Sequence, residues 1–130
     1  MSGNAPPASR HGLLLFAHGA RDPAWAAPFE AVLARVRAAR PQAQAALAFL
    51  ELMQPDLAAA AAQLVQRGCT QIDVVPLFLG TGGHVRRDVP LLLQRLQSEH
   101  PDTLWTLHDP IGEHPDVIEA IAQAALAAAP

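Results

Sequence analysis

The chain has 130 residues, of which 51% are hydrophobic and 16% charged, a composition typical of one globular domain with one core. Its net charge is −3 without any basic block, so binding to nucleic acid through the phosphates is not expected. All nine residues counted as Lys or Arg are arginines. The lack of lysine excludes Schiff-base chemistry, a pyridoxal-phosphate anchor and a P-loop lysine.

Targeting and redox features indicate a cytoplasmic protein. The sequence has one cysteine, so no intrachain disulfide can form, which suits a reducing compartment. No apolar stretch reaches the roughly 18 residues that a membrane span requires, and the N-terminus lacks the apolar region of a secretory signal. We expect a flexible tail over residues 1–11 and a single α/β domain over residues 12–130.

The first half of the chain alternates between apolar runs and an amphipathic segment. Residues 12–17 form a short uninterrupted apolar run, typical of a strand buried on both faces. Asp22 and Pro23 then provide a helix cap and a first-turn proline. Apolar residues recur at three- and four-residue spacing until Pro41 ends this helix. Residues 45–52 are a second apolar run, and its short length between prolines favours a strand.

The second half of the chain repeats this alternation. Its predicted helices and strands cover residues 56–67, 72–79, 85 or 88 to 99, 103–107 and 115–128. Gly68 follows the first of these helices as a C-cap. Pro90 is expected in the first turn of the next helix, because proline has no backbone N–H to donate within a helix interior.

Strands and helices thus alternate along the chain, with connections of helical length. This order predicts an α/β fold with a four-stranded parallel sheet flanked by helices on both faces. Ligands of such sheets bind beyond the carboxyl ends of the strands. The loops expected to meet at that edge cover residues 18–22, 51–55, 80–87 and 108–114.

Two histidines follow predicted strands at this edge. His18 comes directly after the first apolar run, and His84 comes after the third, each beside glycine. A single loop histidine is most often a helix cap or a surface group. Two at the same edge can converge on one metal ion, because imidazole binds Fe, Co, Ni and Zn well. Two neutral imidazoles would leave an open site, which suits transfer of a metal more than storage.

Glu51 lies at the end of the second apolar run, between Leu50 and Leu52. The steps from His18 to Glu51 and from Glu51 to His84 are equal, and each spans about one strand–helix unit. All three residues therefore fall at the same edge of the sheet. A carboxylate with apolar neighbours is costly without a partner, so Glu51 is a candidate third ligand or general base. A helix cap or a solvated loop acid is the alternative.

Glycines and arginines near the same edge are candidate substrate-binding residues. Gly82 and Gly83 could let a ligand approach the backbone closely, although a flexible turn explains them equally well. Arg21, Arg86 and Arg87 could pair with carboxylates of an acidic substrate, the alternative being solvated surface charge. The glycines do not form a G-x-G-x-x-G or P-loop motif, so nucleotide binding has little support.

Four segments together resemble the CbiX/SirB family of class II chelatases. They are HGARDP at residues 18–23, FLE at residues 49–51, VPLFL at residues 75–79 and GGHVRRDVP at residues 82–90. The similarity extends from about residue 13 to residue 126. One departure is Ala20, which stands where the first motif usually has serine, so any role of a hydroxyl group there is absent.

The resemblance implies a chelatase-like fold that corresponds to one half of the two-domain class II chelatases. It implies a lyase that inserts Co²⁺, Fe²⁺ or Ni²⁺ into sirohydrochlorin, or a related tetrapyrrole, in cobalamin or siroheme biosynthesis. His18 and His84 would be metal ligands and Glu51 a nearby base or ligand. The metal would be a substrate, with no organic cofactor. Short members are expected to form homodimers. A carrier of metal or tetrapyrrole without turnover would use the same residues and is the alternative.

Overall fold

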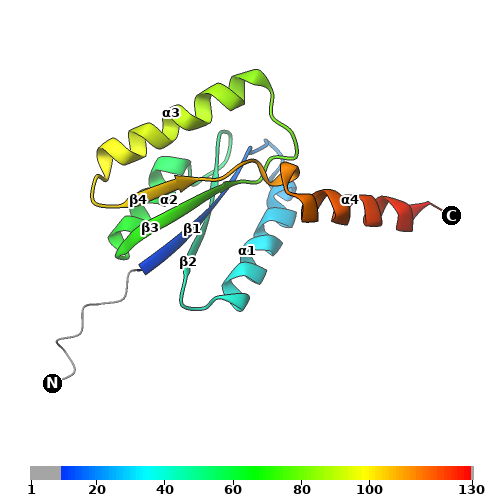
Figure 1. The fold of residues 1–130 in the computed structure, drawn as a ribbon, viewed down its shortest axis with the longest axis horizontal. Coiled ribbons are helices and arrows are strands. Elements are labelled where there is room, and N and C mark those ends of the chain that lie inside the picture. Colours follow the sequence, from blue (N-terminus) through cyan, green and yellow to red (C-terminus); the bar gives the residue numbers. More distant parts are fainter. Residues whose placement is uncertain (1–9, 130) are drawn as a thin grey trace.

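The computed structural model describes residues 10–129, which form one four-stranded sheet in the order β2-β1-β3-β4 (Figure 1). Each pair of neighbouring strands is parallel. The strands are β1 (Arg10–Ala17), β2 (Gln44–Phe49), β3 (Cys69–Pro76) and β4 (Leu104–Leu107). The predicted α/β fold with four parallel strands is therefore confirmed.

The helices follow the strands in the predicted alternation. They are α1 (Ala27–Ala39), α2 (Leu57–Gln66), α3 (Gly83–Glu99) and α4 (Pro115–Ala128), with short 3-10 helices at Pro23–Ala26 and Ile111–Glu113. Asp22 and Asp56 accept hydrogen bonds from backbone N–H groups of the first turns that follow them, at 2.9 and 2.8 Å. Within residues 10–129, no helix is both long enough and apolar enough to span a membrane.

The two faces of the sheet are covered unequally. Leu14 and Phe16 of β1 lie fully buried in a cluster with apolar residues of α2 and α3. Leu15, one residue away along the strand, belongs to a smaller cluster on the α1 side. This alternation is the period-two pattern of a strand buried on both faces. The core is therefore thicker on the side of α2 and α3.

Two strands begin earlier than their apolar runs. β1 starts at Arg10, so His11 lies within a strand and not in the tail where we expected it. Residues 1–9 of that predicted tail lie outside the described part of the chain. β3 starts at Cys69 and ends at Pro76, earlier than the predicted residues 72–79. Arg10 and Cys69 are register partners. Backbone pairing does not depend on side-chain polarity, so apolar runs place these ends imperfectly.

α3 also begins earlier than predicted. Gly82 is its N-cap in extended backbone conformation, so His84 lies in the first helical turn and Pro90 in the helix interior, not in the first turn. Proline there removes one hydrogen bond to the preceding turn. The ring of Pro90 is exposed, whereas Val89, Leu93 and Leu96 are buried against the sheet. Burial of that face holds the helix together across the proline.

The last helix departs from the expected layering. α4 extends away from the sheet, and none of its residues is buried (Figure 1). Its neighbour in space is the 3-10 helix that directly precedes it. The prediction that helices flank both faces therefore holds for α1, α2 and α3, whereas α4 leaves part of the α1 side uncovered.

The core on the α2 side provides the first test. Leu64 of α2 is fully buried, so Leu64→Ala should lower the free energy of unfolding by about 2–5 kcal/mol through the cavity it leaves. Leu91→Ala is the matched control, because Leu91 is 59% exposed and its truncation should cost less than about 0.5 kcal/mol. Urea denaturation measures both values. Equal losses in the two variants would contradict the described core.

Candidate functional site

The candidate site lies in the loops that follow β1 and β2. These neighbouring parallel strands end at Ala17 and Phe49, so the loops that follow them start side by side. The N–H of Leu50 donates to the carbonyl of Ala17 at 2.8 Å, and the N–H of Glu51 donates to the carbonyl of His18 at 3.1 Å. Backbone hydrogen bonds thus continue past the strands and hold residues 18 and 51 together.

The side chains of His18 and Glu51 meet at this point. His18 Nε2 lies 3.1 Å from Glu51 Oε1, and the two side chains are 46% and 56% exposed. The His18 ring also lies edge-on to Phe78, which follows β3, with ring centroids 6.1 Å apart. The pair is anchored from one side and open to solvent on the other. An imidazole and a carboxylate so placed can bind a divalent cation or pass a proton.

Gly19 makes this approach possible. Its φ is +98°, and a Cβ atom at this position would lie 1.8 Å from the carbonyl oxygen of Glu51. Such a contact is impossible without moving one of the two loops. Our sequence analysis gave weight to Gly82 and Gly83 but none to Gly19. The glycine directly after His18 was the available signal, since a backbone that must pass close to another chain segment favours glycine.

His84 lies apart from this pair. It sits in the first turn of α3, where its Nε2 is 3.0 Å from Asp88 Oδ2, and its side chain is 83% exposed. Within residues 10–129, no group of three His, Cys, Asp or Glu side chains could hold a metal ion. The structure therefore brings together two of the three predicted residues, and the role of His84 remains a prediction.

The predicted substrate-binding residues lie in the loop after β1 and at the start of α3. A Cβ atom added to Gly82 or Gly83 would meet nothing within 4 Å, so the backbone there is open to solvent. Arg86 donates to the Thr81 hydroxyl at 3.3 Å, and Arg87 donates to the Gly83 carbonyl at 3.3 Å. Arg21 is exposed in the loop after His18. These arginines lie at the predicted edge, where they can meet an anionic ligand.

A hollow of about 340 Å³ lies between the start of α3 and the loop after β4. Phe78, Thr81, Arg86 and Glu113 are among its lining residues. The loop after β4 is tied to the loop after β3 at Gly112, whose N–H donates to the Phe78 carbonyl at 2.9 Å. His18, Glu51 and His84 do not line this hollow. It lies at the same edge of the sheet but beside the imidazole–carboxylate pair.

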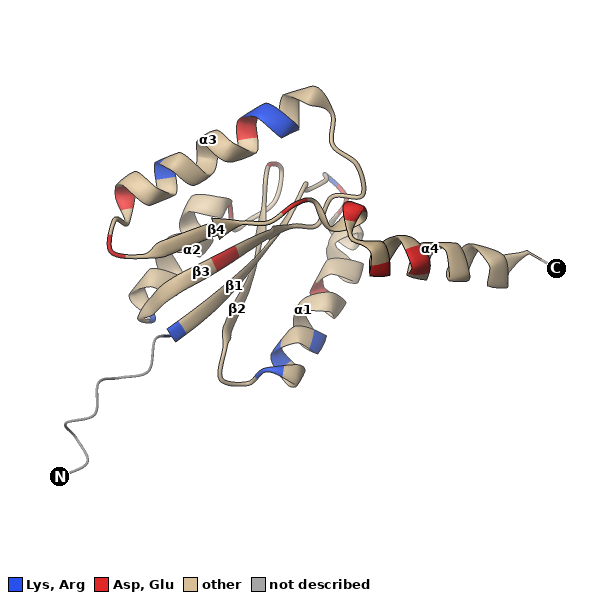
Figure 2. Ribbon diagram, viewed as in Figure 1, with Lys and Arg blue, Asp and Glu red and all other residues tan. Residues whose placement is uncertain are grey.

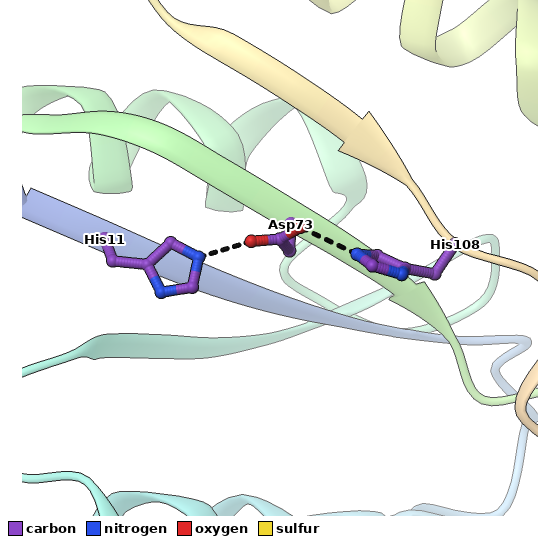
Figure 3. Close-up of polar contacts among 3 residues, drawn as sticks. All are labelled: His11, Asp73 and His108. Carbon is purple, nitrogen blue, oxygen red and sulfur yellow. Dashed lines mark hydrogen bonds and ion pairs between the residues drawn. The ribbon is translucent and has the colours of Figure 1, made fainter.

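A second polar cluster lies on the sheet face next to α1. Asp73 lies in the middle of β3, where Figure 2 shows an acidic position. His11 Nε2 contacts Asp73 Oδ2, and His108 Nε2 lies 2.7 Å from Asp73 Oδ1 (Figure 3). Burial opposes ionisation of Asp73, but the hydrogen bonds and charges of His108 and His11 outweigh it, so the pKa of Asp73 is lowered.

Sequence analysis missed this cluster. It placed His11 in the tail, whereas His108 lies, as predicted, in the loop after β4. The available signal was Asp73 itself, a carboxylate inside the apolar run from Ile72 to Val75. A partly buried carboxylate needs partners, but only the strand register reveals which residues provide them.

The family model CbiX matches residues 12–128. The chain belongs to the CbiX family. This confirms the resemblance found in the four sequence motifs. The fold is similar to that of a solved structure, a putative cobalamin (vitamin B12) biosynthesis CbiX protein from Marinobacter aquaeolei. The TM-score is 0.79 and the sequence identity 35%, and the match covers 89% of this chain and 94% of that one.

Two curated relatives are similar in sequence. A sirohydrochlorin cobaltochelatase from Saccharolobus solfataricus is 31% identical over 110 residues, covering 78% of this CbiX chain and 82% of the relative. A sirohydrochlorin ferrochelatase from Bacillus subtilis is 35% identical over 75 residues, covering 58% of this chain. The match spans only 29% of that longer ferrochelatase, but most of the archaeal relative.

The close approach at Gly19 can be tested by adding one methyl group. Gly19→Ala should lower the free energy of unfolding by more than about 1 kcal/mol, because the left-handed backbone is unfavourable for alanine and the Cβ collides with Glu51. Gly80→Ala is the control, since its added Cβ would meet nothing within 4 Å. Chemical denaturation compares the two variants, and a fully stable Gly19→Ala protein would refute the described loop contact.

The Asp73 cluster predicts a pH-dependent contribution to stability. Because the pKa of Asp73 is lowered by folding, its ionised form stabilises the protein above the unfolded value of about 3.9, and this contribution disappears as pH falls through the folded value. Asp73→Asn should therefore cost about 1–2 kcal/mol at neutral pH and progressively less below about pH 4.

Denaturation curves recorded from pH 7 downward measure this difference. Asp102→Asn is the matched control, since Asp102 is an exposed carboxylate in the turn after α3. A loss for Asp73→Asn that stays constant across the acidic range would show that ionised Asp73 is not what stabilises the fold.

Proposed function

We propose that this chain is a sirohydrochlorin chelatase that inserts Co²⁺ or Fe²⁺, with Ni²⁺ a further candidate, into the tetrapyrrole. The observation that carries the proposal is the solvent-accessible His18–Glu51 pair at the carboxyl edge of a CbiX-family sheet. The names of the relatives, a cobaltochelatase and a ferrochelatase, support the reaction class and the choice of metals. The preference among these metals depends on availability as well as affinity.

The proposed chemistry exchanges two protons for one metal ion. As the divalent metal enters the macrocycle, two pyrrole N–H bonds break and both protons must leave. His18 would present the metal through neutral imidazole, which is the form that binds metals. Glu51, whose carboxylate lies 3.1 Å from the imidazole, would take up a proton or steady the incoming cation. Both roles require exposed side chains, as observed.

His84 is proposed to join the metal site when substrate is bound. The His84–Asp88 pair that now holds it is exposed, and such pairs contribute only about 0–1 kcal/mol. Phe78, which touches the His18 ring, is followed after one residue by the glycine-rich loop that leads to His84. Binding of the metal by both histidines would require the start of α3 to move so that the His84 imidazole approaches His18.

The substrate's acidic side arms suggest roles for the remaining residues. Arg21, Arg86 and Arg87 would anchor carboxylates of the macrocycle, for which guanidinium groups offer paired N–H donors. The open backbone at Gly82 and Gly83 would let the flat ring approach closely. The 340 Å³ hollow beside Arg86 is too small for the whole macrocycle and suits one side arm.

A macrocycle needs two walls, and one domain of this size provides one. We therefore also propose a homodimer in which a second copy provides the other wall, with tetrapyrrole clefts near the subunit boundary. The cytoplasmic location inferred from the sequence remains a prediction.

Substitution of His18, Glu51 and His84 tests the proposal. His18→Ala and His84→Ala should each reduce metal insertion by about a hundredfold or more, and Glu51→Gln should slow insertion with little loss of metal affinity. The measurement is an anaerobic assay that follows the tetrapyrrole spectrum with Fe²⁺, Co²⁺ and Ni²⁺ in parallel. A large loss of affinity in Glu51→Gln, with unchanged turnover at saturating metal, would make Glu51 a ligand instead of a base.

His100→Ala and Glu99→Gln are the matched controls. Both residues lie at the far end of α3, which runs from the carboxyl edge to the opposite edge of the sheet. They should retain insertion activity. Normal turnover of His18→Ala would refute the assigned site. If the unsubstituted protein binds metal or tetrapyrrole tightly without multiple turnovers, the result would instead favour the alternative function, a carrier of metal or tetrapyrrole.

A further inference from the structure

Two exposed leucines lie at the carboxyl edge of the sheet, in the loops on either side of His18. Leu52 follows Glu51 in the loop after β2, and Leu79 follows Phe78 in the loop after β3. The two leucines are 60% and 68% exposed. Because β1 lies between β2 and β3, the loop that bears His18 starts between these two loops. The roles proposed above for metal and protons use neither leucine.

Leu52 also has an unfavourable backbone conformation. Its φ is +68°, and it is the only non-glycine residue with a positive φ within residues 10–129. The left-handed conformation is costly for an L-residue because its Cβ atom crowds the following carbonyl oxygen. The loop must turn sharply here, since the N–H of Phe49 donates to the carbonyl of Pro55 at 2.9 Å. Glycine would make the same turn without this cost.

Burial of the Leu52 side chain does not offset the cost. A leucine stabilises a fold when its side chain leaves water, whereas Leu52 is mostly exposed. Its neighbour Met53 packs against the apolar cluster on the α1 side and so connects this loop to the core. Strained residues of this kind concentrate at functional sites, where the surrounding structure holds them in place for a ligand. The strain at Leu52 therefore indicates a use for its exposed side chain.

Glycines of neighbouring loops hold the backbone next to both leucines. Gly19 passes directly beside the carbonyl of Glu51, as described above. In the same way, a Cβ atom added to Gly112 would lie 2.0 Å from the carbonyl oxygen of Leu79. Each leucine thus starts from a fixed point of the main chain while its side chain remains in solvent. A ligand would find both side chains already in position, which lowers the entropy lost on binding.

The charges at this edge favour an apolar contact with the proposed substrate. The acidic side arms of a tetrapyrrole would meet Arg21 and Arg86, but also the carboxylates of Glu51, Asp109 and Glu113. Attraction and repulsion of the arms therefore partly cancel. The flat faces of the macrocycle are apolar, so contact between a face and a leucine side chain removes apolar surface from water whatever the charges nearby.

We propose that Leu52 and Leu79 bind one face of the tetrapyrrole on either side of the His18–Glu51 pair. The two side chains hold the ring over the imidazole and the carboxylate, while other residues bind the metal and the acidic arms. The inference rests on the proposed function, because it takes a tetrapyrrole as the ligand. It assigns the strain at Leu52 to substrate binding and not to the stability of the fold.

Leu52→Gly tests this assignment, because glycine removes the side chain and relieves the strained backbone together. The free energy of unfolding should change little, since relief of strain offsets the greater freedom of glycine in the unfolded chain. The affinity for metal-free sirohydrochlorin, measured by titration of its absorbance, should fall about tenfold or more as apolar burial is lost. The affinity for Co²⁺ should stay the same. Leu79→Ala should weaken tetrapyrrole binding in the same way.

Leu91→Ala is the matched control, because it truncates an exposed leucine of α3 outside these loops and should keep full affinity. Unchanged sirohydrochlorin affinity in Leu52→Gly and Leu79→Ala would overturn the proposal. So would a loss of stability in Leu52→Gly that matches the loss of affinity, or a changed solution mass, which would assign the leucines to contact between copies.

The binding titration also separates this inference from the proposed function. Normal metal insertion by the unsubstituted chain, with binding that does not depend on the leucines, would overturn the inference alone. Binding that depends on the leucines, without insertion, would overturn the chelatase activity and leave the inference standing. An unsubstituted chain that does not bind sirohydrochlorin would overturn both.

Discussion

The backbone contact between the loops after β1 and β2 is the constraint on which the candidate site depends. Gly19 passes so close to the carbonyl of Glu51 that no other residue fits, and the N–H of Glu51 donates to the carbonyl of His18. These contacts exist because β1 lies between β2 and β3, so its C-terminal loop has neighbours on both sides. Phe78 provides the second neighbour. The imidazole and carboxylate are thus held by main chain and need no buried pocket to keep them together.

The two faces of the sheet are covered unequally. α2 and α3 give one face a continuous core, whereas α1 alone covers the other. The uncovered part includes Asp73, which remains ionised because two imidazoles offset the cost of partial burial. Apolar and polar groups on this face therefore occur together.

The alternation of strands and helices could be predicted from apolar runs, caps and breakers, and so could the edge at which His18 and Glu51 meet. The first residues of β1 and β3 could not be predicted, because strand pairing at Arg10 and Cys69 uses backbone groups that every residue has. The start of α3 was predicted too late. Pro90 suggested a first turn, but burial of Val89 and Leu93 maintains the helix around it.

By itself, the amino-acid sequence determined the fold class, the order of the elements and the motifs that place this chain in the CbiX family, because periodicity and spacing are local properties. The tertiary structure alone decided which residues face each other. It paired His18 with Glu51, kept His84 apart from that pair, and joined His11 to His108 through Asp73. It also directed α4 away from the sheet. These outcomes depend on strand register and on the conformation of single hinge residues, which side-chain patterns along one chain do not encode.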